Sequence, residues 1–131
     1  MFTLAFERTH RVLLARFTGV FTSEDIVQLD RAVIPFVAQE GPVRGLMDFS
    51  SIEAFAVPHT LVAARGRLRE IVPGQQRVIV VPNMEIYELA RLYASQQRDV
   101  GNLEPLVVHS LGDAYRLLGL ERPDFQPLPD M

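Results

Sequence analysis

The chain has 131 residues, a formal net charge of −3, and 48% hydrophobic residues, which predicts one compact domain. It has no cysteine, which excludes disulfides and thiol chemistry, and its thirteen basic residues are all arginine, which excludes a Schiff-base or phosphate-loop lysine. The acidic balance argues against general binding to nucleic acids or to anionic membranes.

The first third of the chain predicts two strands and a helix. Apolar residues alternate over 2–6 and over 12–18, which is typical of half-buried strands and predicts an antiparallel hairpin. Thr22 and Asp25 then match a capping box at the start of a helix. Pro35 inside that helix predicts a kink. The kink either opens space for a ligand beside the sheet or only bends a surface helix.

Residues 45–60 predict the site. They read as a short strand over 45–47 that ends at Asp48, a serine-containing turn, an apolar loop over 54–57 and a helix opened by Pro58. In open α/β sheets, ligands and partners bind beyond the carboxyl ends of the strands. The candidate partner- or ligand-binding residues of this stretch are Asp48, Ser50, Ser51, Phe55, Val57, His59 and Thr60.

The apolar loop has two interpretations. Loops normally lie at the surface, so four apolar residues over 54–57 indicate either a flap folded over the core or a patch on which a partner docks. Both interpretations single out Phe55 for mutation.

The second half of the chain alternates helices with buried strands. The expected elements are a helix with Leu61, Ala64, Leu68 and Ile71 buried and a stop at Pro73-Gly74, a strand over 77–81, a helix capped by Asn83, a strand over 106–108, and a helix between Ser110 and Gly119. Strands that alternate with amphipathic helices predict an α/β fold with right-handed crossovers. We therefore expect one domain over 1–120, with a mostly parallel five-stranded sheet and four helices, and a proline-rich strap or loose tail over 121–131.

The order of these elements resembles that of the STAS and SpoIIAA-like domains. The passages that carry the resemblance are 17–22 before the first helix, 46–52, and 107–110 followed by Asp113-Ala114. The resemblance covers about residues 3 to 120 and implies the same fold. It also implies a regulatory module that is not an enzyme.

One branch of that family switches partner binding by phosphorylating a serine at the start of a helix, where a phosphate is well stabilised. Asp48 and Ser50 match the first half of that branch's motif, but Ala56 and Val57 stand where its Asp and phosphorylated Ser would be. Val57 has no hydroxyl, so the switch cannot operate there, and Thr60 is three residues out of place. The departure favours the SpoIIAA-like branch, for which lipids or apolar ligands are the expected cargo.

Other chemistries fit the sequence less well. Asp48, the two serines and His59 invite a hydrolase interpretation, but no Gly-x-Ser-x-Gly elbow is present, and satisfied turn amides explain them more simply. The three histidines lie far apart and the glycines occur singly, so we expect neither a metal nor a nucleotide cofactor. The arginines at 65, 67 and 69 could receive an acidic partner or a headgroup, although a solvated helix face is the simpler interpretation.

Two functional hypotheses follow. The first is a non-enzymatic interaction module that docks a protein partner or a second copy of itself through the apolar loop and the start of the second helix. The second is a carrier that holds an apolar molecule between the kinked first helix and the sheet, lined by Phe17, Phe36 and Met47. Neither a signal peptide nor a transmembrane segment is expected, so cytoplasm is the expected location.

Overall fold

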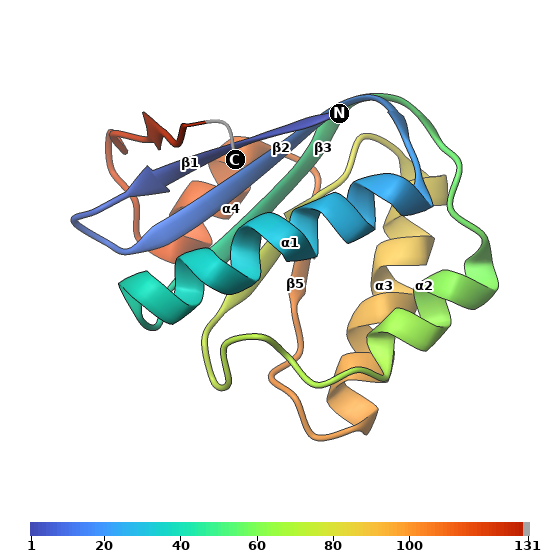
Figure 1. Ribbon diagram of the computed structural model, residues 1–131. Helices are drawn as coiled ribbons and strands as arrows, with labels where there is room; N and C mark the ends of the chain where they lie inside the picture. Colours follow the sequence, from blue (N-terminus) through green and yellow to red (C-terminus); the bar gives the residue numbers. More distant parts are fainter. Residues whose placement is uncertain (130–131) are drawn as a thin grey trace.

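The computed structural model, which describes residues 1–129, contains four helices and a six-stranded sheet (Figure 1). The helices are α1 (Ser23–Glu40), α2 (His59–Gly66), α3 (Met84–Asp99) and α4 (Leu111–Leu118). The strands are β1 (Phe2–Glu7), β2 (Val12–Phe21), β3 (Arg44–Phe55), β4 (Arg77–Val80), β5 (Leu106–Val108) and β6 (Gln126–Pro127). The predicted α/β class and the four helices are confirmed.

The sheet has the order β5-β4-β3-β2-β1-β6. Strands β2 to β5 are mutually parallel, and β1 is antiparallel to both of its neighbours. The expected count of five strands is wrong, because part of the proline-rich segment adds β6 to the edge of the sheet: Phe6 lies opposite Gln126, and the Leu128 amide donates to the Leu4 carbonyl at 2.9 Å. These residues lie along β1 as a strap does. Residues 130–131 of the predicted tail lie outside the described residues.

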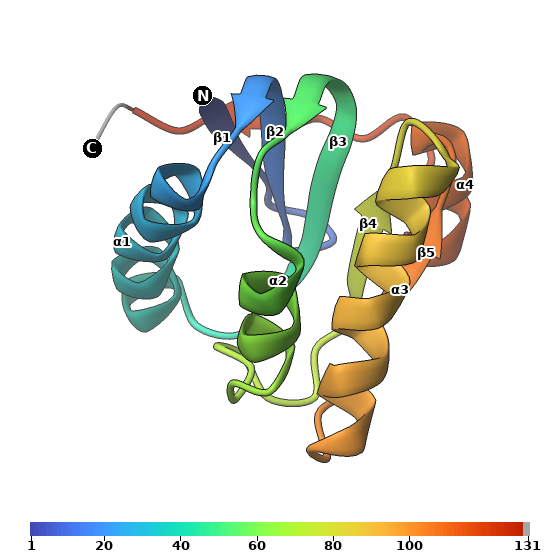
Figure 2. The ribbon, with the colours of Figure 1, turned by 90° about the vertical axis from the view of Figure 1, so that its right-hand side faces the viewer.

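Helices cover the two faces of the sheet unequally. α1, α2 and α3 pack on one face, over the larger apolar core, and α4 packs on the other, over a smaller one (Figure 2). The arrangement follows from topology, because three successive right-handed crossovers in one direction bring their helices to the same face. α1 continues through Pro35 to Glu40 as one uninterrupted helix.

The predicted start signals of α1, α3 and α4 and the predicted stop signal of α4 are confirmed. The Thr22 amide donates to Asp25 Oδ2 at 2.9 Å, and the Asp25 amide donates to Thr22 Oγ1 at 3.4 Å, which completes the capping box. Asn83 and Ser110 each accept from a first-turn amide of α3 and α4. Gly119 ends α4 at φ 70°, a left-handed conformation that favours glycine.

Strand β3 corrects a prediction. It does not end at Asp48 but continues to Phe55, so the first two residues of the predicted loop belong to a strand. Its length follows from pairing with β2, which extends as far as Phe21 opposite Phe55. The strand tolerates a buried carboxylate because Arg16 Nε donates to Asp48 Oδ2 at 3.1 Å. Asp48, Ser50 and Ser51 therefore indicated a turn where the strand in fact continues.

Helix α2 is shorter than predicted. It ends at Gly66 and not at Pro73-Gly74. The side chain of Gln97, on α3, donates to the carbonyls of Gly66 and Leu68 at 2.6 and 2.9 Å, so these acceptors are satisfied without a further helical turn. Leu61, Leu68 and Ile71 were expected on a buried stripe, but their exposed fractions are 38%, 58% and 41%.

The turn between β1 and β2 is built around a buried carboxylate. Glu7 accepts from the backbone amide of His10 at 2.6 Å, from His10 Nδ1 at 2.9 Å and from the Thr9 amide at 3.3 Å. Burial by itself raises the pKa of Glu7, but the hydrogen bonds from His10 and Thr9 and the charge of His10 outweigh it. The net pKa of Glu7 is lowered.

This lowered pKa predicts a pH dependence of stability. A carboxylate with a depressed folded-state pKa contributes stability above its unfolded pKa, about 4.3, and loses it as the pH falls through the folded value. We expect Glu7→Gln to be less stable than the wild type at pH 7, and to lose less stability between pH 5 and pH 3. Urea denaturation at both ends of this range measures the difference. If the wild type and Glu7→Gln lose equal stability between pH 5 and pH 3, Glu7 is not a source of this pH dependence.

Candidate functional site

The predicted site residues lie on both faces of the sheet. Asp48 shares the α4 face with Leu46, whereas Met47 and Phe49 face the larger core. Besides accepting from Arg16, Asp48 accepts from the amide and the hydroxyl of Ser50, at 2.9 and 2.6 Å. Arg16, Asp48 and Ser50 therefore form one hydrogen-bonded group.

The remaining predicted residues lie apart from that group. Phe55 points into the larger core, with its ring centroid 5.2 Å from that of Phe21, and Val57 is 4% exposed. Ser51 is exposed on β3, and His59 and Thr60 are exposed in the first turn of α2. The seven residues therefore do not converge on one site.

The geometry does not assemble a hydrolase triad from these residues. Ser50 Oγ donates to Asp48, and no hydrogen bond among residues 1–129 joins either serine to His59. Nor does this part of the chain hold a group of three or more His, Asp or Glu side chains that could bind a metal ion. A catalytic nucleophile needs a base within hydrogen-bonding reach, and neither serine has His59 as such a base.

A cavity of about 370 Å³ lies between the sheet and the layer formed by α1, α2 and α3. Phe17 and Met47 line it, as the carrier hypothesis expects. Phe36 does not belong to its wall and instead contacts Phe6 edge to face, with ring centroids 5.2 Å apart. The volume lies within the range of ligand pockets, roughly 300–1,000 Å³.

Aromatic rings from β2 and β3 form one end of the cavity. Phe17 stacks on Phe49 with centroids 4.5 Å apart and an angle of 10° between the ring planes. Phe21 meets both rings edge on, at 4.9 and 5.0 Å, and Phe55 lies beside Phe21. All four rings line the cavity. This end offers a ligand carbon surface alone.

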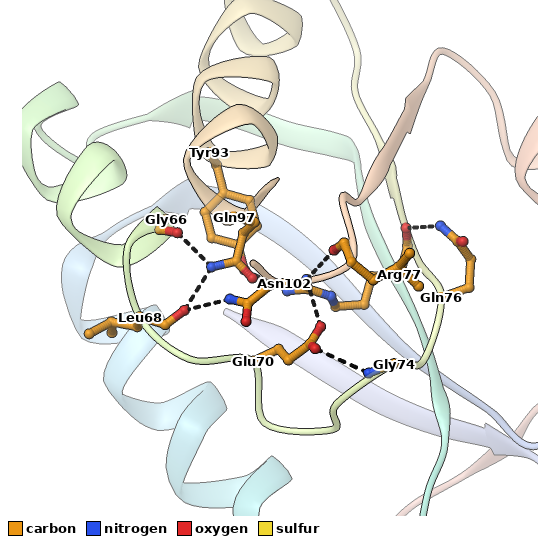
Figure 3. A network of polar contacts seen from close by, with 10 residues as sticks. Gly66, Leu68, Glu70, Gly74, Gln76, Arg77, Tyr93, Gln97 and Asn102 are labelled. Atoms are coloured by element: carbon orange, nitrogen blue, oxygen red, sulfur yellow. Dashed lines mark hydrogen bonds and ion pairs between the residues drawn. The ribbon is translucent and has the colours of Figure 1, made fainter. Parts of the chain in front are cut away.

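Polar side chains surround the other end, near the start of β4 (Figure 3). Arg77 donates to the Tyr93 hydroxyl at 3.0 Å, to the Leu103 carbonyl at 2.8 Å and to Glu70 at 3.4 Å. Gln97, 1% exposed, uses its amide nitrogen to bind the end of α2. Within residues 1–129, no partner reaches Arg77 Nε or Gln97 Oε1. Buried polar atoms without partners are uncommon in native proteins.

An ion pair joins α1 to α2 beside the cavity. Arg65 donates to Asp30 through both terminal nitrogens, at 2.6 and 2.9 Å, and both residues line the cavity. Burial by itself lowers the pKa of Arg65, but the hydrogen bonds and the charge of Asp30 outweigh it, so the pKa is raised. Arg65, interpreted from sequence as a solvated face, is thus a bridge between helices.

The exposed members of the lining mark the mouth of the cavity. Four lining residues are exposed to solvent: Ile34, Leu68, Arg69 and Ile71. One comes from α1 and three from the segment 67–76 that connects α2 to β4. Figure 2 places this segment at the same end of the molecule as the ends of α1 and α3. The cavity thus opens at the amino ends of the parallel strands, opposite to the predicted site.

Sequence reasoning missed Gln97, Arg77 and Glu70. Gln97 carried a weak signal, because it stands four residues after Tyr93 on the buried face of α3. Arg77 was visible only as a charge at the start of an otherwise apolar strand. Nothing local connects either residue to Glu70.

Comparisons with protein-family models, with curated proteins and with solved structures find no match to this chain. The resemblance to STAS and SpoIIAA-like domains therefore stays a prediction, as does its phospho-switch comparison. Among the helices of residues 1–129, none combines the length and the apolar character needed to cross a bilayer.

Proposed function

We propose that this protein binds an apolar small molecule in the cavity beneath α1. The observation that carries the proposal is the cavity itself: about 370 Å³, lined mostly by apolar side chains of three helices and the sheet, with a mouth at one end. Each methylene group of a ligand that leaves water for such a site contributes about 0.8 kcal/mol. An uncharged molecule with an extended apolar portion fits these walls.

The charges around the cavity support a neutral ligand. Asp30 is bound by Arg65, and Glu70 is bound by Arg77, so each charge beside the interior has an opposite partner. A buried ligand charge would lack a counter-ion and would keep its full desolvation cost. Arg69 has no such partner, but it is exposed at the mouth, so its charge does not lie in the interior of the cavity.

Filling the cavity tests the proposal. Ala15 lines the cavity from β2 and is buried. We expect Ala15→Phe to lower the affinity for the neutral fluorophore N-phenyl-1-naphthylamine at least tenfold, because the new ring occupies the space of the probe. We expect Ala15→Leu to fill part of the space and to change stability by no more than about 1 kcal/mol.

A matched control is Ala38→Leu, on an exposed part of α1 outside the lining. It adds the same carbon atoms without entering the cavity, so probe binding should not change. Fluorescence titration measures affinity, and thermal unfolding shows that each variant is folded. Equal probe binding by folded wild type, Ala15→Phe and Ala15→Leu would sink the proposal.

Docking through the start of α2 stays a separate hypothesis. The exposed hydroxyl of Thr60 and the exposed ring of His59 favour it, because both are free to meet a partner. Phe55→Asp would be a poor test, since Phe55 contacts Phe21 and Phe49 and a charge there would disturb the core. Thr60→Glu, on the surface, tests docking without that cost. A self-association that it leaves unchanged would argue against this face.

A further inference from the structure

Exposed apolar side chains gather around the cavity mouth. Ile34, Leu68 and Ile71 form its rim, with exposed fractions of 52%, 58% and 41%. Val100 and Leu103, also exposed, follow α3 at the same end of the molecule. We call these five residues the apolar rim. Large exposed apolar patches of this kind mark interaction sites.

Hydrogen bonds fix the two halves of the apolar rim to one another. Asn102 Nδ2 donates to the Leu68 carbonyl at 2.9 Å, and Arg77 donates to the Leu103 carbonyl at 2.8 Å. Figure 3 shows the first of these contacts, between Asn102 and Leu68, near the end of α3. The segments 67–76 and 100–103 therefore form one continuous surface.

The charge of this surface is positive, although the whole protein is acidic. Arg67 and Arg69 are exposed within the surface, and neither forms an ion pair with any of residues 1–129. The nearby acids are already engaged: Glu70 with Arg77, Asp99 with Arg98, and Glu104 with Arg91 and Arg98. Two unpaired arginines beside apolar side chains complement a partner whose outer layer is anionic and whose inner layer is apolar.

We propose that the apolar rim docks on an anionic phospholipid bilayer, with the cavity mouth toward the lipid. The inference rests on the proposed function, because a mouth held against lipid lets an apolar ligand pass without crossing water. Side chains such as Leu68 would enter the boundary between headgroups and acyl chains, and the arginines would meet phosphates. The net charge of −3 argues against general membrane affinity. Salt screens charges that lie more than about a Debye length from the bilayer, however, so the arginines beside the mouth act on the lipid more strongly than the acidic residues elsewhere.

Vesicle sedimentation tests the inference. The probes are vesicles of phosphatidylcholine alone and of phosphatidylcholine with about one third phosphatidylglycerol. We expect the protein to sediment with the anionic vesicles only, and to be released by salt. Arg67→Gln and Arg69→Gln should each weaken binding about fivefold, and the pair Leu68→Ser with Ile71→Ser should abolish it.

Matched controls come from the opposite face. Leu117→Ser removes an exposed leucine from α4, 49% exposed against 58% for Leu68, and Arg122→Gln removes an arginine with no ion pair among the described residues. Both should bind anionic vesicles as the wild type does. Thermal unfolding of every variant verifies folding.

Several outcomes would overturn the inference. These are sedimentation with neither vesicle, equal sedimentation with both, or rim variants that bind as well as the controls. A concentration-dependent dimer that Leu68→Ser dissolves, without vesicle binding, would assign the apolar rim to a second copy of the chain. Binding of N-phenyl-1-naphthylamine in solution needs no vesicle, so failure of docking and failure of the cavity are told apart.

Discussion

Phe17→Ala is expected to lower the free energy of unfolding by about 3–5 kcal/mol. Phe17 has no exposed surface and stacks on Phe49, with Phe21 edge on at 4.9 Å. Its removal forfeits the transfer energy of a large ring and the contacts of two others. Because the ring also borders the cavity, the neighbours on that side cannot collapse fully into the gap.

Urea denaturation measures this loss, and two variants calibrate it. Phe125→Ala removes a half-buried ring that lies 6.3 Å from Tyr115 on the other face, and should cost far less. Phe17→Leu keeps most of the apolar volume and remains measurable if the alanine variant is unfolded. A loss at Phe17 no larger than that at Phe125 would mean that the four stacked and edge-on rings do not stabilise the larger core as expected.

Gly66→Ala is expected to destabilise the protein by about 2 kcal/mol, although alanine is the better helix former. A β-carbon at Gly66 would lie 2.6 Å from Gln96 Cβ and 3.0 Å from the Tyr93 carbonyl oxygen. Both atoms belong to the body of α3 and cannot rotate away. The gain in helix propensity, at most about 1 kcal/mol, does not offset the displacement of α2.

Gly112→Ala is the matched control. Gly112 lies in the first turn of α4, where a new β-carbon would approach nothing closer than 3.9 Å, and we expect a stabilisation of up to about 1 kcal/mol. The same chemical change should therefore have opposite signs in the two helices. Chemical denaturation of both variants decides the matter. Equal signs would show that α2 and α3 are not in close contact at Gly66.

Local signals account for what the sequence predicted correctly. Thr22, Asn83 and Ser110 cap their helices through hydrogen bonds that span three residues, so the chain itself contains all the information needed. The alternation of strands and helices then restricts the topology, because crossovers are right-handed. The α/β class and the parallel centre of the sheet followed from these rules.

Long-range contacts account for what the sequence could not reveal. The length of β3 depends on a partner strand some thirty residues earlier in the chain, as the pair of Phe21 and Phe55 illustrates. The end of α2 depends on Gln97, thirty-one residues beyond Gly66. Leu68 matched the helical spacing of Leu61 and Ala64, yet lies on the surface of a connecting segment.

The candidate site was harder still to predict. A cavity is a property of how helices stand away from a sheet, and no spacing of residues in one helix encodes that distance. Phe17 and Met47, which were predicted to line the cavity, do so because both side chains lie on the face of the sheet that carries the larger core. Phe36 was misplaced because its neighbour on the sheet, Phe6, could not be known from the helix alone.

The sheet ends in very short strands on both sides. β5 has three residues and β6 has two, so each free edge presents few unpaired amides and carbonyls. A second chain that paired with either edge would form too few backbone hydrogen bonds to stay attached. Short edge strands of this kind protect native proteins from open-ended polymerisation. If the protein forms dimers, we therefore expect its copies to meet through side chains rather than through a shared ladder. Such dimers should also be discrete and not fibrillar.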